Sequence, residues 1–387
     1  MSDRYKKYKG IVDFIKNIYG KDIIPLHEPV FAGNEKKYIN QCIDSTFVSS
    51  IGEYVNKFEE MVSTFTSAKY TVATVNGTSG LHIALKLSGV ESGNEVITQP
   101  LTFVATCNAI SYLNARPVFI DVSKKTLGLS PDSLSGFLSK YVDMDNGCAI
   151  NKKTLNKIKT CIPVHTFGIP CEIDKIVELC SKYNIKVVED ASESLGSYYK
   201  KKHTGGYGLI SVISFNGNKI ITSGGGGMII TNNKELSQMA KHITTTSRIP
   251  DRWEYVHDCI GYNYRMPNIN AALGCAQLEQ IEFFLQKKRE IAKKYSGFFK
   301  KYNNIQFFDE PENCKWNGWL NTIIMADRKE RDEFLEYTNN NGIMTRPAWR
   351  LMHKLDMYKD CFRIDLSNAE FLESRIVNIP SSANTKI

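Results

Sequence analysis

Short apolar runs alternate with amphipathic stretches between about residues 34 and 267. The apolar runs have the length and β-branched content of buried strands: 70–75, 95–99, 116–122, 160–168, 184–190, 209–215 and 227–231. The stretches between them repeat apolar residues every three or four positions, as helices do: 35–44, 53–67, 79–90, 103–112 and 174–183. This alternation predicts an α/β fold with a mostly parallel central sheet and helices on both faces.

The pattern changes at two places, and these changes suggest the domain organisation. Residues 141–158 are polar and break the strand–helix rhythm, so we interpret them as a surface insertion. Residues 269–302 have continuous helical periodicity, which predicts one long helix leading to a second domain. We therefore expect an N-terminal arm at 1–33, a large domain at 34–267, and a linker helix with a small C-terminal α/β domain at 268–387.

Charge and cysteine content exclude several classes of protein. The net charge is +8 in 387 residues, and the basic residues are scattered, whereas nucleic-acid binding favours a dense basic stripe. The ten cysteines form no CxxC pair, so we expect reduced thiols and no metal site. The N-terminus leads into no apolar segment, and no run reaches the ~18 apolar residues of a membrane helix. We expect a cytoplasmic protein without membrane or nucleic-acid partners.

Polar residues cluster where the predicted strands end. In an open α/β sheet, ligands bind at the carboxyl ends of the strands. The candidates at these ends are Asn76, Gly77, Thr78, Ser79, His165, Asp190, Glu193, Ser214 and Lys219. The sequence therefore predicts one binding site built from these side chains.

The segment "NGTSG" joins a predicted strand to a predicted helix. Its glycine relaxes the turn, and its hydroxyls and free N–H groups suit a phosphate at a helix N-terminus. A plain helix cap by Thr78 or Ser79 is the alternative.

Two further residues at strand ends have two possible roles each. Asp190 is either a turn residue or an anionic partner for a buried cationic nitrogen. His165 taken alone is more typical of a satisfied core histidine than of a catalytic residue.

Lys219 follows the strand at 209–215 and precedes four glycines at 224–227. A lysine in this position can be desolvated, which frees its amine to act as a nucleophile, although a solvated loop lysine is the alternative. A phosphate cup, a buried carboxylate and an amine at neighbouring strand ends are what pyridoxal phosphate requires. The amine forms a Schiff base, the carboxylate keeps the ring nitrogen protonated, and the cup holds the phosphate.

The chain also resembles a known family, the DegT/DnrJ/EryC/StrS sugar-nucleotide aminotransferases of pyridoxal-phosphate fold type I. The resemblance covers nearly the whole chain and rests on "NGTSGLHIAL", "TFVATCNAI", "PVHTFG", "VVEDASESLGS", "SFNGNKIITSGGGGM", "GYNYRMPNINAALG" and "TRPAWRLMH". "SFNGNKIIT" and "EDASESLGS" are most similar to the branch that makes UDP-N-acetylbacillosamine and legionaminic-acid precursors. The resemblance implies that 34–267 is the cofactor-binding domain.

The resemblance also implies roles for individual residues. Lys219 corresponds to the Schiff-base lysine, Asp190 to the partner of the pyridinium nitrogen, and Glu193 to a residue near the ring hydroxyl. Thr78, Ser79 and Ser214 would hold the phosphate beside Gly77. Phe103 would stack on the ring, and Asn263 would reach the phosphate of the neighbouring subunit. His165 would shape the same pocket as a third catalytic residue.

For the substrate we expect contacts from Trp319, Arg346 and His353. The alternative for Trp319 is that it belongs to the core of the small domain.

Two relatives of this family are disfavoured. Dehydratases replace the lysine with histidine, and this chain keeps Lys219. Iron–sulfur members need clustered cysteines, whereas Cys259, Cys275, Cys314 and Cys361 are widely spaced.

The resemblance leads us to expect a homodimer with shared active sites. The enzyme would transfer an amino group from glutamate to C4 of a nucleotide-linked 4-keto-6-deoxy (2-acetamido) hexose, in the biosynthesis of surface glycans. Alternatives are a 3-keto sugar or cyclitol transaminase, or a non-catalytic regulator with this fold.

Overall fold

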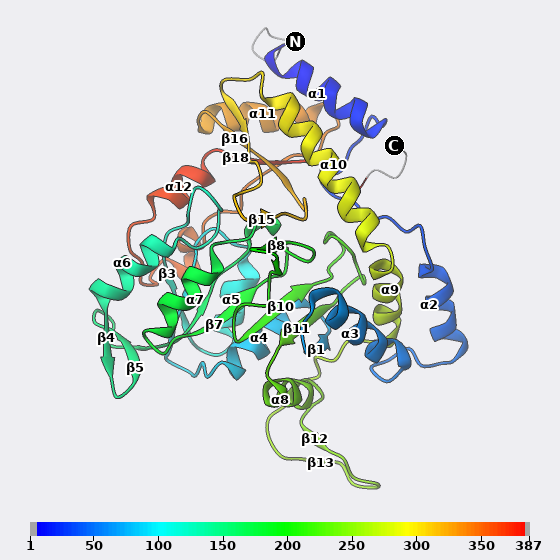
Figure 1. Cartoon of the computed structure of the whole chain (residues 1–387), viewed down its shortest axis with the longest axis vertical. Coiled ribbons are helices and arrows are strands. Elements are labelled where there is room, and N and C mark those ends of the chain that lie inside the picture. The colour runs from blue at the N-terminus through cyan, green and yellow to red at the C-terminus, as the bar shows by residue number, and fades with distance from the viewer. Residues whose placement is uncertain (1–5, 384–387) are drawn as a thin grey trace.

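A computed structural model describes residues 6–383 of the chain, and its centre is a large mixed sheet (Figure 1). The strands along its main path follow the order β3–β2–β6–β7–β10–β11–β1. Their bounds are Tyr70–Thr74 (β1), Glu95–Thr98 (β2), Arg116–Phe119 (β3), Lys157–Ile162 (β6), Lys186–Asp190 (β7), Ile210–Ser214 (β10) and Gly227–Thr231 (β11). Neighbours from β3 to β10 pair in parallel, whereas β11 pairs antiparallel with β10 and β1. The predicted mostly parallel sheet is confirmed.

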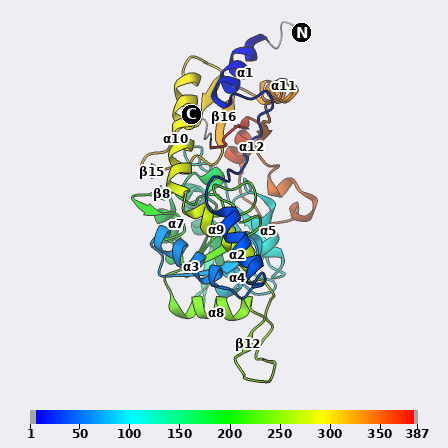
Figure 2. The same cartoon turned by 90° about the vertical axis from the view of Figure 1, so that its right-hand side faces the viewer.

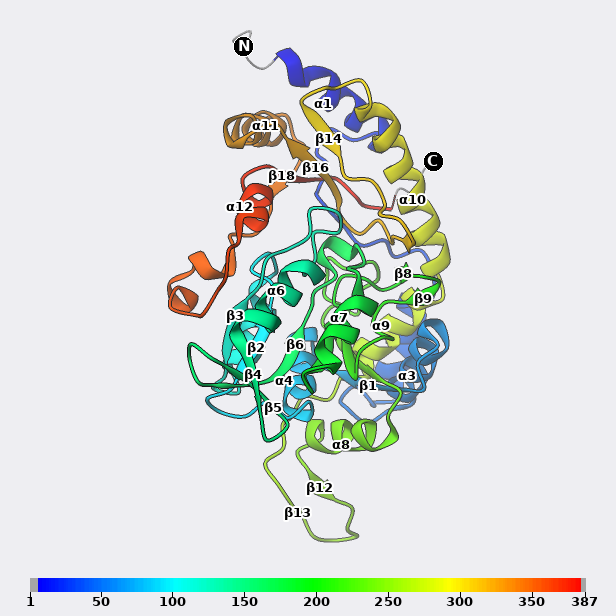
Figure 3. The same ribbon diagram turned by 60° about the vertical axis from the view of Figure 1, so that its left-hand side comes forward.

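Helices cover both faces of this sheet (Figures 1 and 3). The core on one face joins the sheet to α4 (Gly77–Leu87), α5 (Val104–Ser111) and α8 (Lys234–Thr244). The other face packs against α3 (Glu53–Thr66), α6 (Pro131–Tyr141), α7 (Ile173–Ser181) and α9 (Asn268–Leu278). Because strand side chains alternate, Val187 belongs to the second face and Val188 to the first. This alternation decides which polar residues reach the site.

The polar segment at 141–158, interpreted from the sequence as a surface insertion, contains a β-hairpin. It contains β4 (Val142–Asp145) and β5 (Cys148–Asn151), and β5 continues into the large sheet by pairing antiparallel with β6. The hairpin lies at the margin of the molecule in Figure 1.

A smaller antiparallel sheet forms the upper part of the molecule in Figure 1. Its order is β14 (Ile305–Phe307), β16 (Asn321–Met325), β18 (Ile376–Ile379) and β17 (Arg346–Pro347), accompanied by α11 (Arg328–Asn340) and α12 (Ser367–Glu373). A three-stranded sheet of β15 (Cys314–Lys315), β8 (Tyr198–Tyr199) and β9 (Lys202–His203) ties this region to the large domain. The expected small C-terminal α/β unit is thus present in the fold.

Two expected features differ in detail. The stretch at 269–302 is two helices, α9 and α10 (Ile281–Phe299), because the chain leaves the helical conformation around Gln280. The expected N-terminal arm includes α1 (Lys6–Tyr19), which packs on α11 (Figures 1 and 2). Tyr8 is buried against the Phe334 ring at 5.3 Å and donates a hydrogen bond to Glu330. The apolar face of α1 therefore joins it to the small domain, while α2 (Glu35–Asp44) packs on α9.

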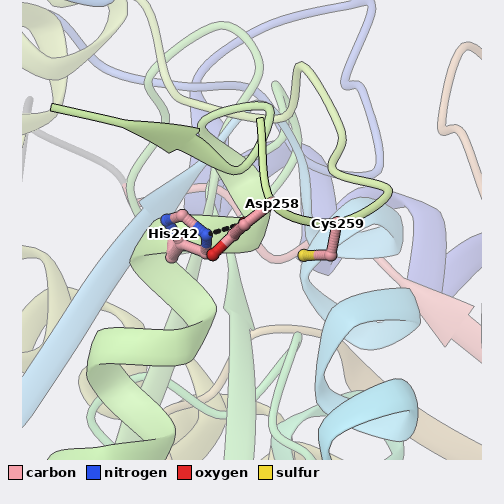
Figure 4. A group of neighbouring side chains, drawn as sticks. All are labelled: His242, Asp258 and Cys259. Atoms are coloured by element: carbon pink, nitrogen blue, oxygen red, sulfur yellow. Dashed lines mark hydrogen bonds and ion pairs between the residues drawn. The ribbon is translucent and has the colours of Figure 1, made fainter. Parts of the chain in front are cut away.

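A long hairpin, β12 (Arg248–Ile249) and β13 (Val256–His257), projects from the large domain beyond α8 (Figure 1). Its base is attached to α8 by a 2.7 Å hydrogen bond between His242 Nε2 and Asp258 Oδ1 (Figure 4). The Cys259 thiol lies next to this pair, with the three ligand-type atoms within 4.8 Å of one another. The hairpin tip is exposed, including Trp253 and Tyr255. No helix within residues 6–383 has the length and apolarity that crossing a membrane requires.

Candidate active site

A cavity of about 590 Å³ opens at the carboxyl ends of β7 and β10, next to the segment that carries β17. This is the edge of the sheet at which α/β proteins bind ligands. The predicted cofactor residues that line it are Gly77, Thr78, Phe103, Asp190, Glu193, Ser214 and Lys219. Trp319 and Arg346, predicted to meet the substrate, line it too. The fold thus brings together side chains that lie far apart in the sequence, such as Thr78 and Arg346.

Asp190 ends β7 and is almost completely buried. Its Oδ2 accepts a 2.7 Å hydrogen bond from the Thr106 hydroxyl on α5, and its Oδ1 accepts a 3.1 Å bond from the Ser192 N–H. No basic side chain within residues 6–383 forms an ion pair with this carboxylate. A buried carboxylate with two neutral donors and an open cavity beside it is suited to pairing with a cationic ligand nitrogen.

Lys219 enters the cavity from the loop after β10, and its side chain is 14% exposed. Its Nζ lies 3.4 Å from Glu193 Oε1 and 4.0 Å from the centre of the Trp319 ring. The Trp319 indole nitrogen donates to the Asn218 carbonyl at 2.6 Å, which fixes the ring against the loop that carries the lysine. Trp319 is therefore both a buried packing residue and part of the cavity wall.

Glu193 supplies the second carboxylate of the cavity. Its Oε2 accepts the Phe167 N–H at 2.8 Å, and its Oε1 faces Lys219. Burial raises the pKa of this carboxyl to about 7, and the nearby Asp190 acts in the same direction, while Lys219 opposes them. The amine of Lys219 therefore has a neighbour that can take or hold a proton near neutral pH.

The N-terminus of α4 faces the cavity from a third side. Asn76 caps this helix by accepting the Ser79 N–H at 2.8 Å. A Cβ on Gly77 would lie only 3.0 Å from the Ser214 Cβ, so the glycine allows the helix end to approach the end of β10. Thr78, Ser214 and the first N–H groups of α4 form a cup that suits a phosphate. The Ser79 side chain does not line the cavity, and a bond from its hydroxyl to the phosphate stays a prediction.

The cavity mouth combines aromatic rings with a guanidinium. Phe103 is 53% exposed at the start of α5, and its ring centre lies 6.1 Å from that of Trp349. Arg346 is exposed, and its Nη1 donates to Asn339 Oδ1 at 3.1 Å and to the Thr345 carbonyl. These bonds hold the guanidinium at the rim while leaving other N–H groups available to a ligand.

His165 does not take part in the cavity as expected. Its Nε2 lies 3.1 Å from Glu189 Oε2, and its Nδ1 accepts the Cys171 N–H at 3.2 Å. Glu189 and Asp190 are consecutive in β7, so their side chains point to opposite faces of the sheet. The His165 ring sits on the Glu189 face and does not line the cavity. These contacts favour the alternative of a satisfied core histidine, and a direct catalytic role stays a prediction.

Two further residues lie away from the cavity of their own chain. His353 is buried beside Phe119, its Nε2 is 3.6 Å from Glu370 Oε1, and it does not line the cavity of its own chain. Its substrate contact stays a prediction. Asn263 is exposed and pairs through its backbone with Thr245. An exposed Asn263 outside its own cavity leaves the prediction of a contact to a second subunit untested.

Sequence reasoning missed residues that the fold adds to the site. Thr106 lies one turn after Phe103, so the helical spacing of "TFVAT" could have placed it beside the aspartate. Asn76 precedes the predicted helix and is a preferred capping residue, a signal that was available in the sequence. Ser192 and Asn216 line the cavity from loops, where no periodicity predicts a direction.

The residues present fit pyridoxal phosphate. The amine of Lys219, the buried carboxylate of Asp190 and the cup at Thr78 and Ser214 all face one cavity. The Gly77 close approach leaves the cup open, since a larger residue would meet Ser214. Phe103 offers an exposed ring at the same opening. Each chemical group of the cofactor thus has a complementary side chain in this structure.

Comparison with known proteins agrees with this assignment. The chain is 39% identical over 359 residues to the GDP-perosamine synthase of Escherichia coli O157:H7, with 92% of this chain and 93% of that protein covered. It is 33% identical to the putative pyridoxal phosphate-dependent aminotransferase EpsN of Bacillus subtilis, covering 93% and 91%. The structure of Helicobacter pylori PseC, an aminotransferase of pseudoaminic acid biosynthesis, superposes with a TM-score of 0.84 at 27% identity, covering 94% of each chain.

The family assignment follows from the extent of these matches. Residues 30–386 match the model of the DegT/DnrJ/EryC1/StrS aminotransferase family. The architecture is that of fold type I, and the enzymatic activity is transamination with pyridoxal phosphate as the cofactor. The chain, with its lysine, aspartate and phosphate cup in one cavity, belongs to the DegT/DnrJ/EryC1/StrS aminotransferase family.

Proposed function

We propose that the enzyme transfers an amino group from glutamate to C4 of a nucleotide-linked 4-keto-6-deoxy hexose. The observation that carries this proposal is the position of Lys219 between Glu193 and the open part of the cavity, with Arg346 and aromatic rings at the mouth. A sugar ring suits flat aromatic walls, and carboxylates or phosphates suit an arginine fork. The names of the curated relatives support a nucleotide sugar as the substrate.

The chain's own residues have separate tasks in this reaction. Pyridoxal phosphate, when bound, supplies an electron-withdrawing ring to which the bonding electrons of the substrate carbon can delocalise. Asp190 keeps the ring nitrogen protonated, and Thr106 orients that carboxylate. Lys219, as a free amine, moves the proton to and from the substrate carbon. Glu193, with its pKa raised to about 7, accepts or returns a proton beside that amine.

We also propose a homodimer with shared sites. Large apolar side chains are exposed on α2 and the segment that follows it: Ile43, Phe47, Val48 and Ile51. Exposed apolar side chains that gather in this way mark interaction surfaces. Asn263 is exposed and lies outside the cavity of its own chain, so a second copy is the partner to which it can contribute.

The test is an amination assay of the holoenzyme with glutamate and paired sugar nucleotides. We expect 2-oxoglutarate to form over many turnovers with a 4-keto-6-deoxy hexose, and not beyond one equivalent per site with the matching 3-keto sugar. GDP-linked and UDP-linked 2-acetamido substrates distinguish the nucleotide, and the relatives' names favour GDP. Turnover of the 3-keto sugar or of a keto cyclitol alone would contradict the C4 assignment. If no amino donor bleaches the absorption band of the bound cofactor, the alternative of a non-catalytic regulator is favoured.

A further inference from the structure

A second cleft, of about 400 Å³, shares a wall with the catalytic cavity. Pro347 and Ala348 line both hollows. The second one is formed by the start of α11, the end of α12 and the segment after β17. Its charged lining residues are Arg328, Arg331, Arg350, Lys354 and Glu373, and we call it the basic cleft. Four cationic groups face one carboxylate, so the lining has an excess of positive charge.

The cations of the basic cleft are only partly neutralised. Arg331 binds Asp332 Oδ1 at 2.6 Å through Nη2 and the Glu373 carbonyl at 2.6 Å through Nη1, and Lys354 pairs with Glu373. Arg328 has a 77% exposed side chain and a single long ion pair, 3.8 Å from Asp332. The Arg350 guanidinium is exposed and makes no hydrogen bond or ion pair with any residue in 6–383. Arg328 and Arg350 are thus open to an anion.

The shape of the proposed substrate places its charged part near this cleft. In a pyranose, C1 lies across the ring from C4, so a diphosphate on C1 points away from the group that reacts at C4. With C4 near Lys219, the diphosphate leaves the cavity through its mouth. The mouth is bounded by Arg346, Pro347 and Trp349, and Pro347 separates it from the basic cleft.

We propose that the basic cleft binds the diphosphate of the sugar-nucleotide substrate, through Arg328 and Arg350. The inference rests on the proposed function and assigns a part of the substrate to residues outside the catalytic cavity. Arginine is suited to this task because its planar fork matches phosphate oxygens. Arg346 lies on the cavity side and uses Nη1 for Asn339 and Thr345, so it meets the sugar side of the ligand.

The kinetic test uses Arg350→Ala and Arg328→Ala in the holoenzyme. We expect each variant to raise the KM for the nucleotide sugar about 10-fold, which corresponds to about 1.4 kcal/mol. The KM for glutamate, the kcat and the cofactor absorption band stay unchanged, and Arg350→Lys recovers part of the loss. Lys329→Ala is the matched control, because Lys329 is an exposed cation on the same turn of α11 that does not line the cleft. Unchanged KM in both arginine variants overturns the proposal.

A binding measurement keeps the proposal testable if no tested sugar is aminated. Inorganic pyrophosphate is titrated into wild-type and variant holoenzyme by calorimetry, which requires no turnover. We expect binding to the wild type, a loss of about 10-fold in affinity in Arg350→Ala, and competition with the nucleotide sugar. Equal binding to wild type and variants overturns the assignment. Binding that depends on Arg350 without competing with the sugar nucleotide also overturns it, in favour of a separate phosphate effector.

Discussion

The Thr106 hydroxyl donates a 2.7 Å hydrogen bond to the Asp190 carboxylate, and both residues are buried. Thr106 in turn shares a 2.8 Å hydrogen bond with Thr102, which lies just before α5. The Ser192 N–H holds the other carboxylate oxygen. The orientation of Asp190 is therefore set by the protein before any cofactor arrives, which is the preorganisation that electrostatic catalysis needs.

Replacing Thr106 tests this arrangement. Thr106→Val keeps the shape and removes the donor, and hydrogen bonds to charged groups contribute about 1.5–3 kcal/mol. We expect kcat to fall at least about 10-fold, with little change in the KM for glutamate. Ser111→Ala is the control, because Ser111 lies on the same helix, donates to the Cys107 carbonyl and does not line the cavity. Steady-state kinetics measure both variants. If Thr106→Val keeps wild-type activity, as the Ser111→Ala control should, Thr106 has no orienting role.

Asp190→Asn tests the carboxylate itself. An amide cannot balance a cationic ring nitrogen, so the ring becomes a poor electron acceptor. We expect the variant to keep part of its cofactor and to lose at least about 1,000-fold in kcat, on the scale of losing a preorganised electrostatic group. Absorption spectroscopy measures the retained cofactor, and single-turnover kinetics with glutamate measure the loss. If Asp190→Asn has a kcat close to that of the wild type, Asp190 is only a turn residue and does not act on the ring nitrogen.

Glu193 should make the stability of the apoprotein depend on pH. Burial raises its pKa from the ordinary 4.5 to about 7, so the folded state binds a proton that the unfolded state releases at lower pH. Stability from this group is then present below pH 4.5 and is lost as pH rises through 7, by about 3 kcal/mol. Glu193→Gln lacks this dependence.

The measurement is urea denaturation of wild type and Glu193→Gln apoprotein at pH 5 and pH 8. We expect the glutamine variant to gain stability relative to the wild type on going from the lower to the higher pH. The Lys7–Glu330 ion pair lies away from the cavity, so Glu330→Gln is the control for replacing a carboxylate elsewhere in the fold. A relative stability of Glu193→Gln that does not change between the two pH values would contradict the raised pKa.

Hybrid dimers test the shared site. Lys219→Ala removes the amine, and Asn263→Ala removes the proposed contact to the partner's cofactor. In a mixed dimer, one cavity has the intact lysine together with the intact asparagine of the other chain. We expect the mixture to recover up to about a quarter of the wild-type activity per chain, as random pairing puts half the chains in hybrids with one good site each. Hybrids that form and stay inactive would place Asn263 outside the shared site.

The sequence predicted the sheet and the main residues of the cavity because strand ends carry a simple geometric rule. Asp190, Ser214 and Lys219 each follow an apolar run, and parallel strands bring such positions to one edge. The same rule locates a residue along the strand axis and not on a face, so it could not predict which face of the sheet holds His165. Its partner Glu189 points away from Asp190, and only the register of β7 shows this.

Other differences arise from contacts that lie far apart in the sequence. The periodicity at 269–302 continues through the break at Gln280, so a helical pattern alone could not divide α9 from α10. The packing of α1 on α11 depends on a contact between Tyr8 and Phe334, which no local signal predicts. His353 was predicted to meet the substrate because "TRPAWRLMH" offers hydrogen-bond donors, and its burial beside Phe119 depends on a contact that this segment does not signal.

The most direct test of the account is the identity of the lysine that binds the cofactor. The holoenzyme is treated with borohydride, which makes the bond between cofactor and amine permanent, and the modified peptide is mapped by mass spectrometry. The account predicts that the label is on Lys219, and that Lys219→Ala has neither the label nor transaminase activity. A label on any other lysine, or full activity in Lys219→Ala, would contradict it.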